Sequence, residues 1–286
     1  MDLSIIIVSW NVREILRENL RLTLSATAGL SSEVIVIDNA SIDGSAAMVA
    51  SEFPTVKLIA NAENLGFAQA NNQGLTLATG RYLLLFNPDM QPNPSTFTDL
   101  IQWCDQNPGA GVVGVRLVGE HGELVKHVRR LPTLFDQLAI VLKLPHLWQG
   151  LLNHYLRVDF NYTHASVVDS VRGSFFTIRR EVYERLGGLD ARYFVWFEEV
   201  DYCRQVGTIG WSVMYTPTVT CTDLVGKSFS QLPRGRSQQF FQDSMLKYFA
   251  KWHPAWQAVV LRYAWSLGSR IARTGEWLGI NTRAKT

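Results

Sequence analysis

The sequence predicts an open α/β sheet of the Rossmann-like type, and three observations lead to this prediction. Over the first 117 residues, short runs of apolar, strand-forming residues alternate with helix-like stretches. The apolar runs are continuous rather than alternating, which is typical of strands buried on both faces of a parallel sheet covered by helices. Polar side chains follow four of these runs, at the edge where such sheets bind their ligands.

Each element of this first half is predicted from its apolar period. Strands are expected at 4–8, 33–38, 56–60, 82–87 and 111–117, and helices near 12–27, 43–52, 65–78 and 95–106. The segment 118–170 is less regular and is expected to form short helices, because charges and prolines interrupt its apolar run. A further strand is expected at "WSVMYTPTVT" (211–220), and the aromatic, basic tail from residue 254 is expected to be helical.

The size and composition of the chain are those of a globular protein. Its 286 residues suffice for a sizeable core. A formal net charge of +2 argues against bulk binding of nucleic acid, which requires a strongly basic domain or stripe. The odd number of cysteines (Cys104, Cys203 and Cys221) and the lack of a C-x-x-C pair suit reduced thiols in the cytoplasm. We expect neither a signal peptide nor a membrane-spanning helix.

The first candidate site residue is Asp38, at the end of the second predicted strand. It is followed by "NASIDGS", in which Ser41 or Asp43 can cap the next helix. A carboxylate at the carboxyl tip of a strand more naturally accepts hydrogen bonds from a ribose or a base edge. Because no G-x-G-x-x-G follows the first strand, a single nucleotide held by side chains is favoured over a dinucleotide.

A second stretch, "NAENLGFAQANNQG" (61–74), places Gly66 beside several asparagines. Asn71 and Asn72 fall inside the predicted helix, where asparagine is a weak helix former. Amides at these positions either bind a ligand or brace the neighbouring loops. A loop followed by a capped helix is the simpler alternative.

The fourth predicted strand, "YLLLFNPDM" (82–90), ends in a stiff corner. Pro88 fixes its own φ and favours extended geometry at Asn87, so that Asp89 is held in one direction. A divalent cation bound to a diphosphate needs only one or two protein carboxylates, and Asp89 can supply one. The alternative is an ordinary turn residue that closes a strand.

The stretch "WFEEVDYC" (196–203) contains three acids, Glu198, Glu199 and Asp201. Adjacent residues of a helix do not share a face, so the acids are expected to divide their roles. One can point at a reacting hydroxyl while another pairs with a cation or caps the helix. Flanking aromatic residues raise the pKa of a carboxyl, as a general base requires. The alternative is a solvated acidic helix start that complements the helix dipole.

In this order the stretches resemble the inverting glycosyltransferases of family 2, which have the GT-A fold. The sequence is most similar to the rhamnosyltransferase-type bacterial members that build cell-surface polysaccharide. The resemblance covers residues 3–253 and rests on "SIIIVSWN", "VIVIDNASIDGS", "NLGFAQANNQG", "LLLFNPDM", "GSFFTIRREVYERLGGLD" and "FEEVDYC". It implies a GT-A domain at 1–253, divided into a nucleotide-binding half (1–117) and an acceptor-binding half (118–253), and then a helical tail (254–286).

The resemblance also implies a role for each candidate residue. The nucleotide sugar would contact Ser9, Asn11, Asp38, Asn39, Asn64, Gly66, Asn71, Asn87 and Asp89. Asp89 would hold a divalent metal, Mg²⁺ or Mn²⁺, because Asn87-Pro88-Asp89 occupies the Asp-x-Asp position of the family. Glu199 would be the catalytic base that deprotonates the acceptor hydroxyl. The acceptor would be bound or supported by Gly173, Trp196, Glu198 and Asp201.

The sequence departs from the family pattern at three positions. Asn87 replaces the first acid of Asp-x-Asp, and Arg204 stands one position earlier than the usual arginine. Cys221 stands where many relatives have a histidine that helps to hold the metal, and a soft thiolate suits Mg²⁺ poorly.

The activity that the resemblance implies is the transfer of a sugar to a saccharide or lipid-linked saccharide acceptor. dTDP-rhamnose is the favoured donor and a UDP-sugar the alternative. Two other functions stay open. One is a non-catalytic module that binds a sugar nucleotide or saccharide. The other is a sugar nucleotidyltransferase, which would need a basic, glycine-rich N-terminus that "SIIIVSWNVRE" lacks.

The tail "PAWQAVVLRYAWSLGSRIARTGEWLG" (254–279) combines three tryptophans with basic residues. The arginines in and beyond it are Arg262, Arg270, Arg273 and Arg283. Such a helix is too short to span a bilayer but suits the interface of an anionic membrane. We therefore expect a cytoplasmic protein bound peripherally to the inner face of the cell membrane. The alternative is a helix packed on the domain.

Overall fold

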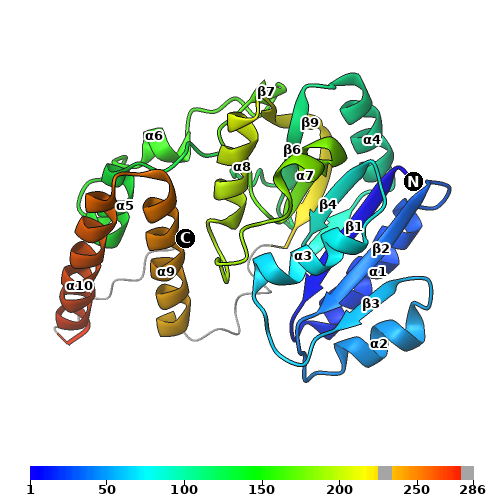
Figure 1. The fold of residues 1–286 in the computed structure, drawn as a ribbon, viewed down its shortest axis with the longest axis horizontal. Coiled ribbons are helices and arrows are strands. Elements are labelled where there is room, and N and C mark those ends of the chain that lie inside the picture. Colours follow the sequence, from blue (N-terminus) through cyan, green and yellow to red (C-terminus); the bar gives the residue numbers. More distant parts are fainter. Residues whose placement is uncertain (225–233, 278–286) are drawn as a thin grey trace.

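The computed structural model describes residues 1–224 and 234–277, and in these residues it contains one mixed sheet (Figure 1). The strand order is β3-β2-β1-β4-β8-β6-β9-β5, with β7 paired to β9. The strands are β1 Leu3–Ser9, β2 Ser32–Asp38, β3 Lys57–Ala60, β4 Tyr82–Phe86, β5 Met90–Pro92, β6 Ala110–Val118, β7 Ser166–Val167, β8 Phe175–Arg179 and β9 Ser212–Asp223. The open mixed α/β sheet predicted for the chain is therefore confirmed.

The N-terminal part of the sheet is parallel. β1 lies between β2 and β4 and runs parallel to both, and β2 runs parallel to β3. Ser9 is in register with Asp38, so the ends of β1 and β2 meet at one edge. β4 is buried along its whole length, as its continuous apolar sequence predicts, whereas the edge strand β3 is only partly buried.

The other part of the sheet contains antiparallel pairs that the apolar period did not reveal. β8 runs antiparallel between β4 and β6, and β6 runs parallel to β9. The short strand β5 follows the Asn87-Pro88-Asp89 corner directly and pairs antiparallel with β9. The corner is thereby fastened to the far end of the sheet, because Leu224 N donates to Asp89 O (3.1 Å).

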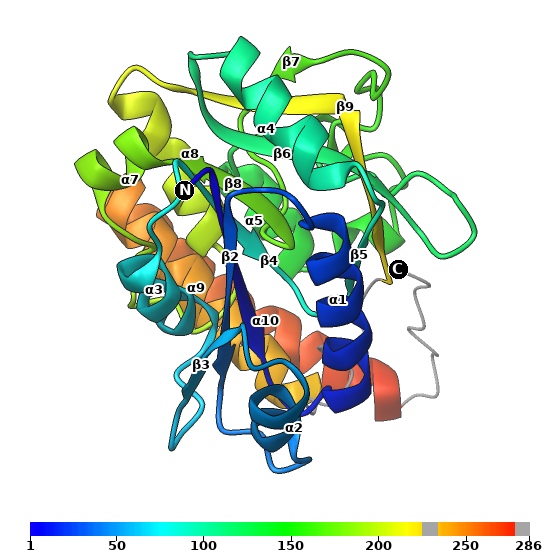
Figure 2. The same ribbon diagram turned by 90° about the vertical axis from the view of Figure 1, so that its right-hand side faces the viewer.

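Helices cover both faces of the sheet, as Figure 2 shows. They are α1 Arg13–Ala26, α2 Ser45–Glu52, α3 Phe67–Leu77, α4 Thr96–Gln106, α5 Leu134–Val141, α6 Asn153–Leu156, α7 Arg180–Leu186, α8 Glu198–Thr208, α9 Arg234–Trp252 and α10 Ala255–Trp277, with a 3₁₀ turn η1 at Leu144–His146. One apolar cluster packs α1, α2 and α4 on the sheet, and the other packs α3, α7, α8 and α9 on the opposite face. The sheet is thus a buried central layer.

The C-terminal helices α9 and α10 lie side by side at one end of the molecule (Figure 1). Asp201 of α8 is fully buried and accepts hydrogen bonds from Lys251 Nζ (2.7 Å) and Trp252 Nε1, which fastens α9 to α8. α10 packs closely on α5, because a Cβ atom on Gly268 would lie 2.3 Å from Val141 O. The predicted helical extension is therefore present, while the division into halves at residue 117 stays a prediction.

No helix in the described part of the chain is both long and apolar enough to cross a membrane. Of the basic residues predicted to face lipid, Arg262 is described and exposed. Arg283 lies outside the described residues, as do the side chains of Arg270 and Arg273.

Candidate functional site

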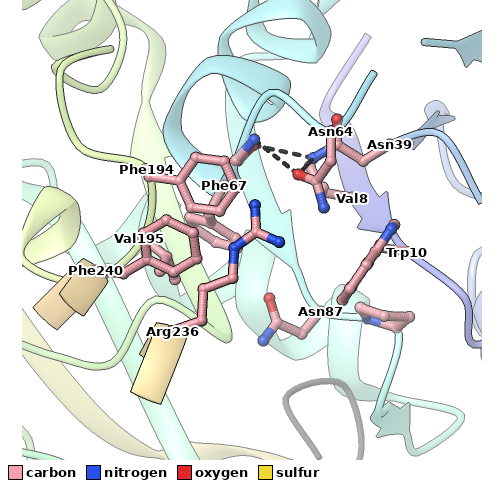
Figure 3. A pocket seen from close by; sticks show the side chains of 12 residues that line it. Val8, Trp10, Asn39, Asn64, Phe67, Asn87, Phe194, Val195, Arg236 and Phe240 are labelled. Carbon is pink, nitrogen blue, oxygen red and sulfur yellow. Dashed lines mark hydrogen bonds between the residues drawn. The ribbon is translucent and has the colours of Figure 1, made fainter. Parts of the chain in front are cut away.

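A pocket of about 220 Å³ opens at the carboxyl ends of β1, β2 and β4 (Figure 3). Its lining residues come from the strand ends, the start of α3, the loop before α8 and the first turns of α9. They are Val8, Trp10, Asn39, Asn64, Gly66, Phe67, Asn87, Pro88, Phe194, Val195, Arg236 and Phe240. Four of the predicted site residues (Asn39, Asn64, Gly66 and Asn87) therefore line one pocket.

Asn39 organises one wall of this pocket. Its Nδ2 donates to Asn64 Oδ1 (2.8 Å) and to Gly66 O (3.2 Å), and its Oδ1 accepts from Leu65 N (3.0 Å) and Asn61 Nδ2 (3.3 Å). The asparagines predicted from the sequence thus join the end of β2 to the loop before α3. This network fixes the loop in place before any ligand binds.

Gly66 brings two distant parts of the chain into contact. Its φ of +81° is a conformation that favours glycine, and a Cβ atom there would lie 2.4 Å from Phe194 O. The next residue, Phe67, donates its N–H to the same carbonyl (2.6 Å). The start of α3 is thereby held against the loop that leads into α8.

Ser9 and Asp38 are buried beside the pocket-lining residues that flank them in the chain. Asp38 Oδ2 accepts from Ser41 N (3.0 Å), whereas Asp38 Oδ1 and Ser9 Oγ have no hydrogen-bond partner among the described residues. A buried polar atom without a partner costs about 1–3 kcal/mol, so these two atoms suit a polar ligand. Asn11, with φ +52°, uses its Oδ1 to accept from Ile42 N (2.8 Å) and braces the loop.

The Asn87-Pro88-Asp89 corner is held by hydrogen bonds to its backbone. Asn87 N donates to Ser174 O (3.0 Å), and Asn19 Nδ2 donates to Asn87 O (3.2 Å) and Met90 O (2.6 Å). Asn19 reaches the corner from α1 and is itself buried. Asp89, only 4% exposed, is therefore presented by a fixed backbone.

Asp223 is a second buried acid near this corner, and it is not among the residues predicted from the sequence. It ends β9 opposite Met90, so that it lies across the strand pair from Asp89. Arg172 Nη1 contacts Asp223 Oδ2 at 3.2 Å. The signal that could have found it was its position, two residues after Cys221 and three residues beyond the strand predicted at 211–220. Cys221 is fully buried in an apolar cluster, and burial holds the pKa of its thiol well above the usual range.

The acids suit a hard divalent cation. No group of three or more His, Cys, Asp and Glu side chains that could hold a metal occurs in residues 1–224 and 234–277. The carboxylates of Asp89 and Asp223 are nevertheless the oxygen donors that Mg²⁺ and Mn²⁺ prefer. A cation that takes its other ligands from phosphates and water fits this donor set, whereas the protonated thiol of Cys221 does not.

Glu198 and Glu199 begin α8 after a strained stretch of backbone. Trp196 and Phe197 have φ of +66° and +69°, a conformation that is unusual for aromatic residues and that concentrates at functional sites. Burial and, after it, repulsion from Glu199 raise the pKa of Glu198 well above its usual range. Burial also raises the pKa of Glu199, and the nearby Arg129 and Arg172 oppose this rise.

Gly173 connects Glu199 with the pocket. A Cβ atom on Gly173 would lie 3.6 Å from Glu199 Cβ and 3.8 Å from the ring of Phe67, which lines the pocket. Arg172, the preceding residue, acts on Glu199 and contacts Asp223. Gly173 therefore lies between Glu199 and the pocket-lining Phe67, and Arg172 lies near both Glu199 and Asp223. Glu199 is half-buried and Glu198 is buried.

Three predicted residues make their described contacts inside the protein rather than in the pocket lining. Asn71 Nδ2 donates to Phe67 O (2.9 Å) within α3, and Trp196 packs edge-on against Phe241. Asp201 faces α9, where it accepts from Lys251 and Trp252. Its role as a supporting residue is consistent with these contacts. Asn72, close to Asn71, braces the loop before α8 through Leu189 N (2.8 Å) and Leu189 O (2.7 Å).

Several lining residues were not predicted. Trp10 and Phe67 lie inside the motifs "SIIIVSWN" and "NLGFAQANNQG", so the presence of an aromatic residue in these motifs could have pointed to them. Phe194, Arg236 and Phe240 lie more than 100 residues from the strand ends that they face, so no local pattern pointed to them.

Comparison with known proteins gives a consistent result. The family model "Glycosyl transferase family 2" matches residues 4–187. The chain is 23% identical over 261 residues to an N-acetylglucosaminyl-diphospho-decaprenol L-rhamnosyltransferase of Mycobacterium tuberculosis, covering 87% of this chain and 84% of that protein. It is 26% identical over 207 residues to the low-salt glycan biosynthesis hexosyltransferase Agl10 of Haloferax volcanii, covering 71% and 60%.

A solved structure shares the fold. The mannosyltransferase PcManGT from Pyrobaculum calidifontis, in complex with GDP-Man and Mn²⁺, superposes with a TM-score of 0.57 at 19% identity. The match covers 96% of this chain and 74% of that one. The predicted GT-A fold is confirmed by this likeness.

Proposed function

Because the chain belongs to glycosyl transferase family 2, we propose that this glycosyltransferase moves a sugar from a nucleotide-diphosphate sugar to a saccharide acceptor, with inversion at the anomeric carbon. The observation that carries the proposal is the pocket at the strand ends. Buried atoms of Ser9 and Asp38 that find no hydrogen-bond partner in the described part of the chain lie beside it. Glu199, whose pKa is raised by burial, lies next to Gly173, which is close to the pocket-lining Phe67. These residues offer a nucleotide site and a general base.

Glu199 is the catalytic base in this proposal. A base must be deprotonated to act, and a carboxyl with a raised pKa takes a proton from the attacking hydroxyl more readily than an ordinary glutamate. Arg129 and Arg172 limit this rise of the pKa, and their positive charges favour the ionised form that a base needs. Inversion follows because the hydroxyl attacks from the side opposite the leaving diphosphate.

Asp89 and Asp223 would hold a divalent cation, Mg²⁺ or Mn²⁺. When bound, such an ion neutralises charge on the diphosphate leaving group. The fixed backbone of the Asn87-Pro88-Asp89 corner orients Asp89 for this purpose, and Arg172 orients Asp223. Asp38 and Ser9 would bind the base or ribose of the donor.

The donor is proposed to be dTDP-rhamnose, with a UDP-sugar as the alternative, and the acceptor a lipid-linked saccharide of cell-surface polysaccharide. Support comes from the name of the mycobacterial relative, an L-rhamnosyltransferase acting with a diphospho-decaprenol-linked sugar. A lipid-linked acceptor would bring the chain to the inner face of the cell membrane, through the exposed apolar side of α10. Family membership disfavours a sugar nucleotidyltransferase and a non-catalytic binding module.

A panel of nucleotide sugars tests the proposed function. The wild type should be protected against thermal unfolding by dTDP-rhamnose more than by UDP- or GDP-sugars, and Mn²⁺ or Mg²⁺ should increase the protection. It should transfer the sugar to polyprenyl-diphosphate-linked N-acetylglucosamine. In the wild type, EDTA should abolish the part of this thermal protection that depends on the metal. The variant Asp89→Asn should lack that part even when metal is present. A protein that no nucleotide sugar protects and that hydrolyses none would contradict the proposal.

A further inference from the structure

Arg236 reaches the pocket from α9, a helix that no sequence motif connects with nucleotide binding. Of the described residues that line the pocket, it alone carries a charge. Figure 3 shows its guanidinium pointing between Asn87 on one side and the rings of Phe67 and Phe194 on the other. Within the described residues no acidic side chain forms an ion pair with it.

Packing and anchoring of α9 define the position of Arg236. Its guanidinium carbon lies 5.7 Å from the centre of the Phe240 ring, and Phe240 stacks on Phe194 at 4.3 Å with an interplanar angle of 20°. Further along α9, Ser244 Oγ donates to Val195 O (2.8 Å). The helix that carries Arg236 is thus fixed to the loop that forms the pocket wall.

We propose that Arg236 binds the diphosphate of the nucleotide sugar, so that the donor site is completed by the C-terminal helix α9. This inference rests on the proposed function and adds a residue to it. A guanidinium forms paired hydrogen bonds with phosphate oxygens, and in a largely apolar pocket such bonds are strong. The other lining residues that the structure describes are neutral, so among them Arg236 alone can offset the negative charge of a diphosphate.

The chemistry of the leaving group gives this position a role in turnover as well as in binding. As the bond to the sugar breaks, negative charge grows on the terminal phosphate of the nucleotide. A cation that binds this phosphate stabilises the growing charge more in the transition state than in the bound donor. Substitution of Arg236 should therefore lower kcat in addition to weakening the binding of the nucleoside diphosphate.

Binding measurements with two kinds of probe test the inference without relying on activity. Calorimetric titration of the wild type and Arg236→Ala with dTDP and UDP should show affinity weakened about tenfold or more, the loss expected for a charged hydrogen-bonding group. NMR titration with thymidine and uridine, which lack phosphate, should give equal affinities for both proteins. Arg236→Lys should retain part of the diphosphate affinity, because it keeps the charge but loses the paired geometry.

A control variant and two possible negative results distinguish a wrong role for Arg236 from a wrong proposed function. Arg262→Ala removes an exposed arginine of α10 outside the pocket and should bind dTDP and UDP like the wild type. If the wild type binds a diphosphate and Arg236→Ala binds it equally well, the role of Arg236 is wrong while the proposed function stands. If the wild type binds neither diphosphate, the proposed function fails and this inference falls with it.

Discussion

Glu198 is buried beside the proposed base, and one of its carboxylate oxygens has no hydrogen-bond partner among the described residues. Burial and the neighbouring Glu199 raise its pKa well above the value in an unfolded chain. The folded protein therefore holds the proton of Glu198 more tightly than the unfolded chain does. Its contribution to stability is fully present below the unfolded pKa and is lost as the pH rises through the folded pKa.

The substitution Glu198→Gln should remove this loss of stability at high pH, because an amide fills the same space as the carboxyl group and does not ionise. We expect the variant to melt at about the same temperature as the wild type near pH 5 and roughly 2 °C or more above it at pH 8. Thermal unfolding followed by circular dichroism at several pH values measures the difference. Glu63→Gln, at an exposed site, should show no such trend. A Glu198→Gln protein that is less stable than the wild type at both pH values would contradict the prediction, because it would show that ionisation of Glu198 does not lower the stability of the folded protein.

At the scale of elements, α10 is apolar on two opposite sides. Ala258, Leu261 and Trp265 pack inward on the core. On the other side, the exposed residues Trp256, Val259, Val260, Tyr263 and Leu267 follow each other at helical spacing. The neighbouring segment adds the exposed side chains of Phe135, Leu147 and Trp148. Arg262 adds a positive charge to this outer stripe, and no acidic residue occurs between residues 254 and 268. The stripe therefore suits an anionic membrane surface.

The double substitution Trp256→Ser and Tyr263→Ser tests the stripe. Sedimentation with vesicles containing phosphatidylglycerol should capture the wild type, and the variant should bind about tenfold more weakly, because aromatic side chains contribute strongly at the interface. Vesicles of phosphatidylcholine alone should capture less of both. Leu77→Ser removes an exposed leucine from α3 and serves as the control. Equal capture of the variant and the wild type would refute lipid binding by the stripe. A wild type that is dimeric in the ultracentrifuge and a variant that is monomeric would instead identify an interface between two copies.

At the scale of the whole molecule, the parallel part of the sheet could be predicted from the sequence because its signal is local. β1, β2, β3, β4 and β6 lie close to the predicted runs. β5 could not be predicted, since it has three residues and pairs with a strand more than 120 residues away. β8 continues directly into α7, so its apolar sequence did not separate from the helix.

The residues of the candidate site also fall into two groups, those that a local sequence pattern predicts and those that only tertiary contacts bring to the site. Asp38, Asn39, Gly66 and Asp89 follow strands or open helices, and local patterns mark such positions. Asp223 reaches the Asp89 corner only through the pairing of β5 with β9, and Arg236 reaches the pocket only through the anchoring of α9. The sequence could therefore predict one wall of the pocket, whereas tertiary contacts supply the other.

The activity of Glu199→Gln, measured together with donor binding, tests most directly whether the pocket and Glu199 form one catalytic site. An amide cannot accept the proton, so kcat should fall by about 10²-fold or more while the affinity for the donor nucleotide stays within a few fold of the wild type. Glu184→Gln, at an exposed position on α7, should retain full activity. A Glu199→Gln enzyme that transfers sugar at the wild-type rate would contradict the account.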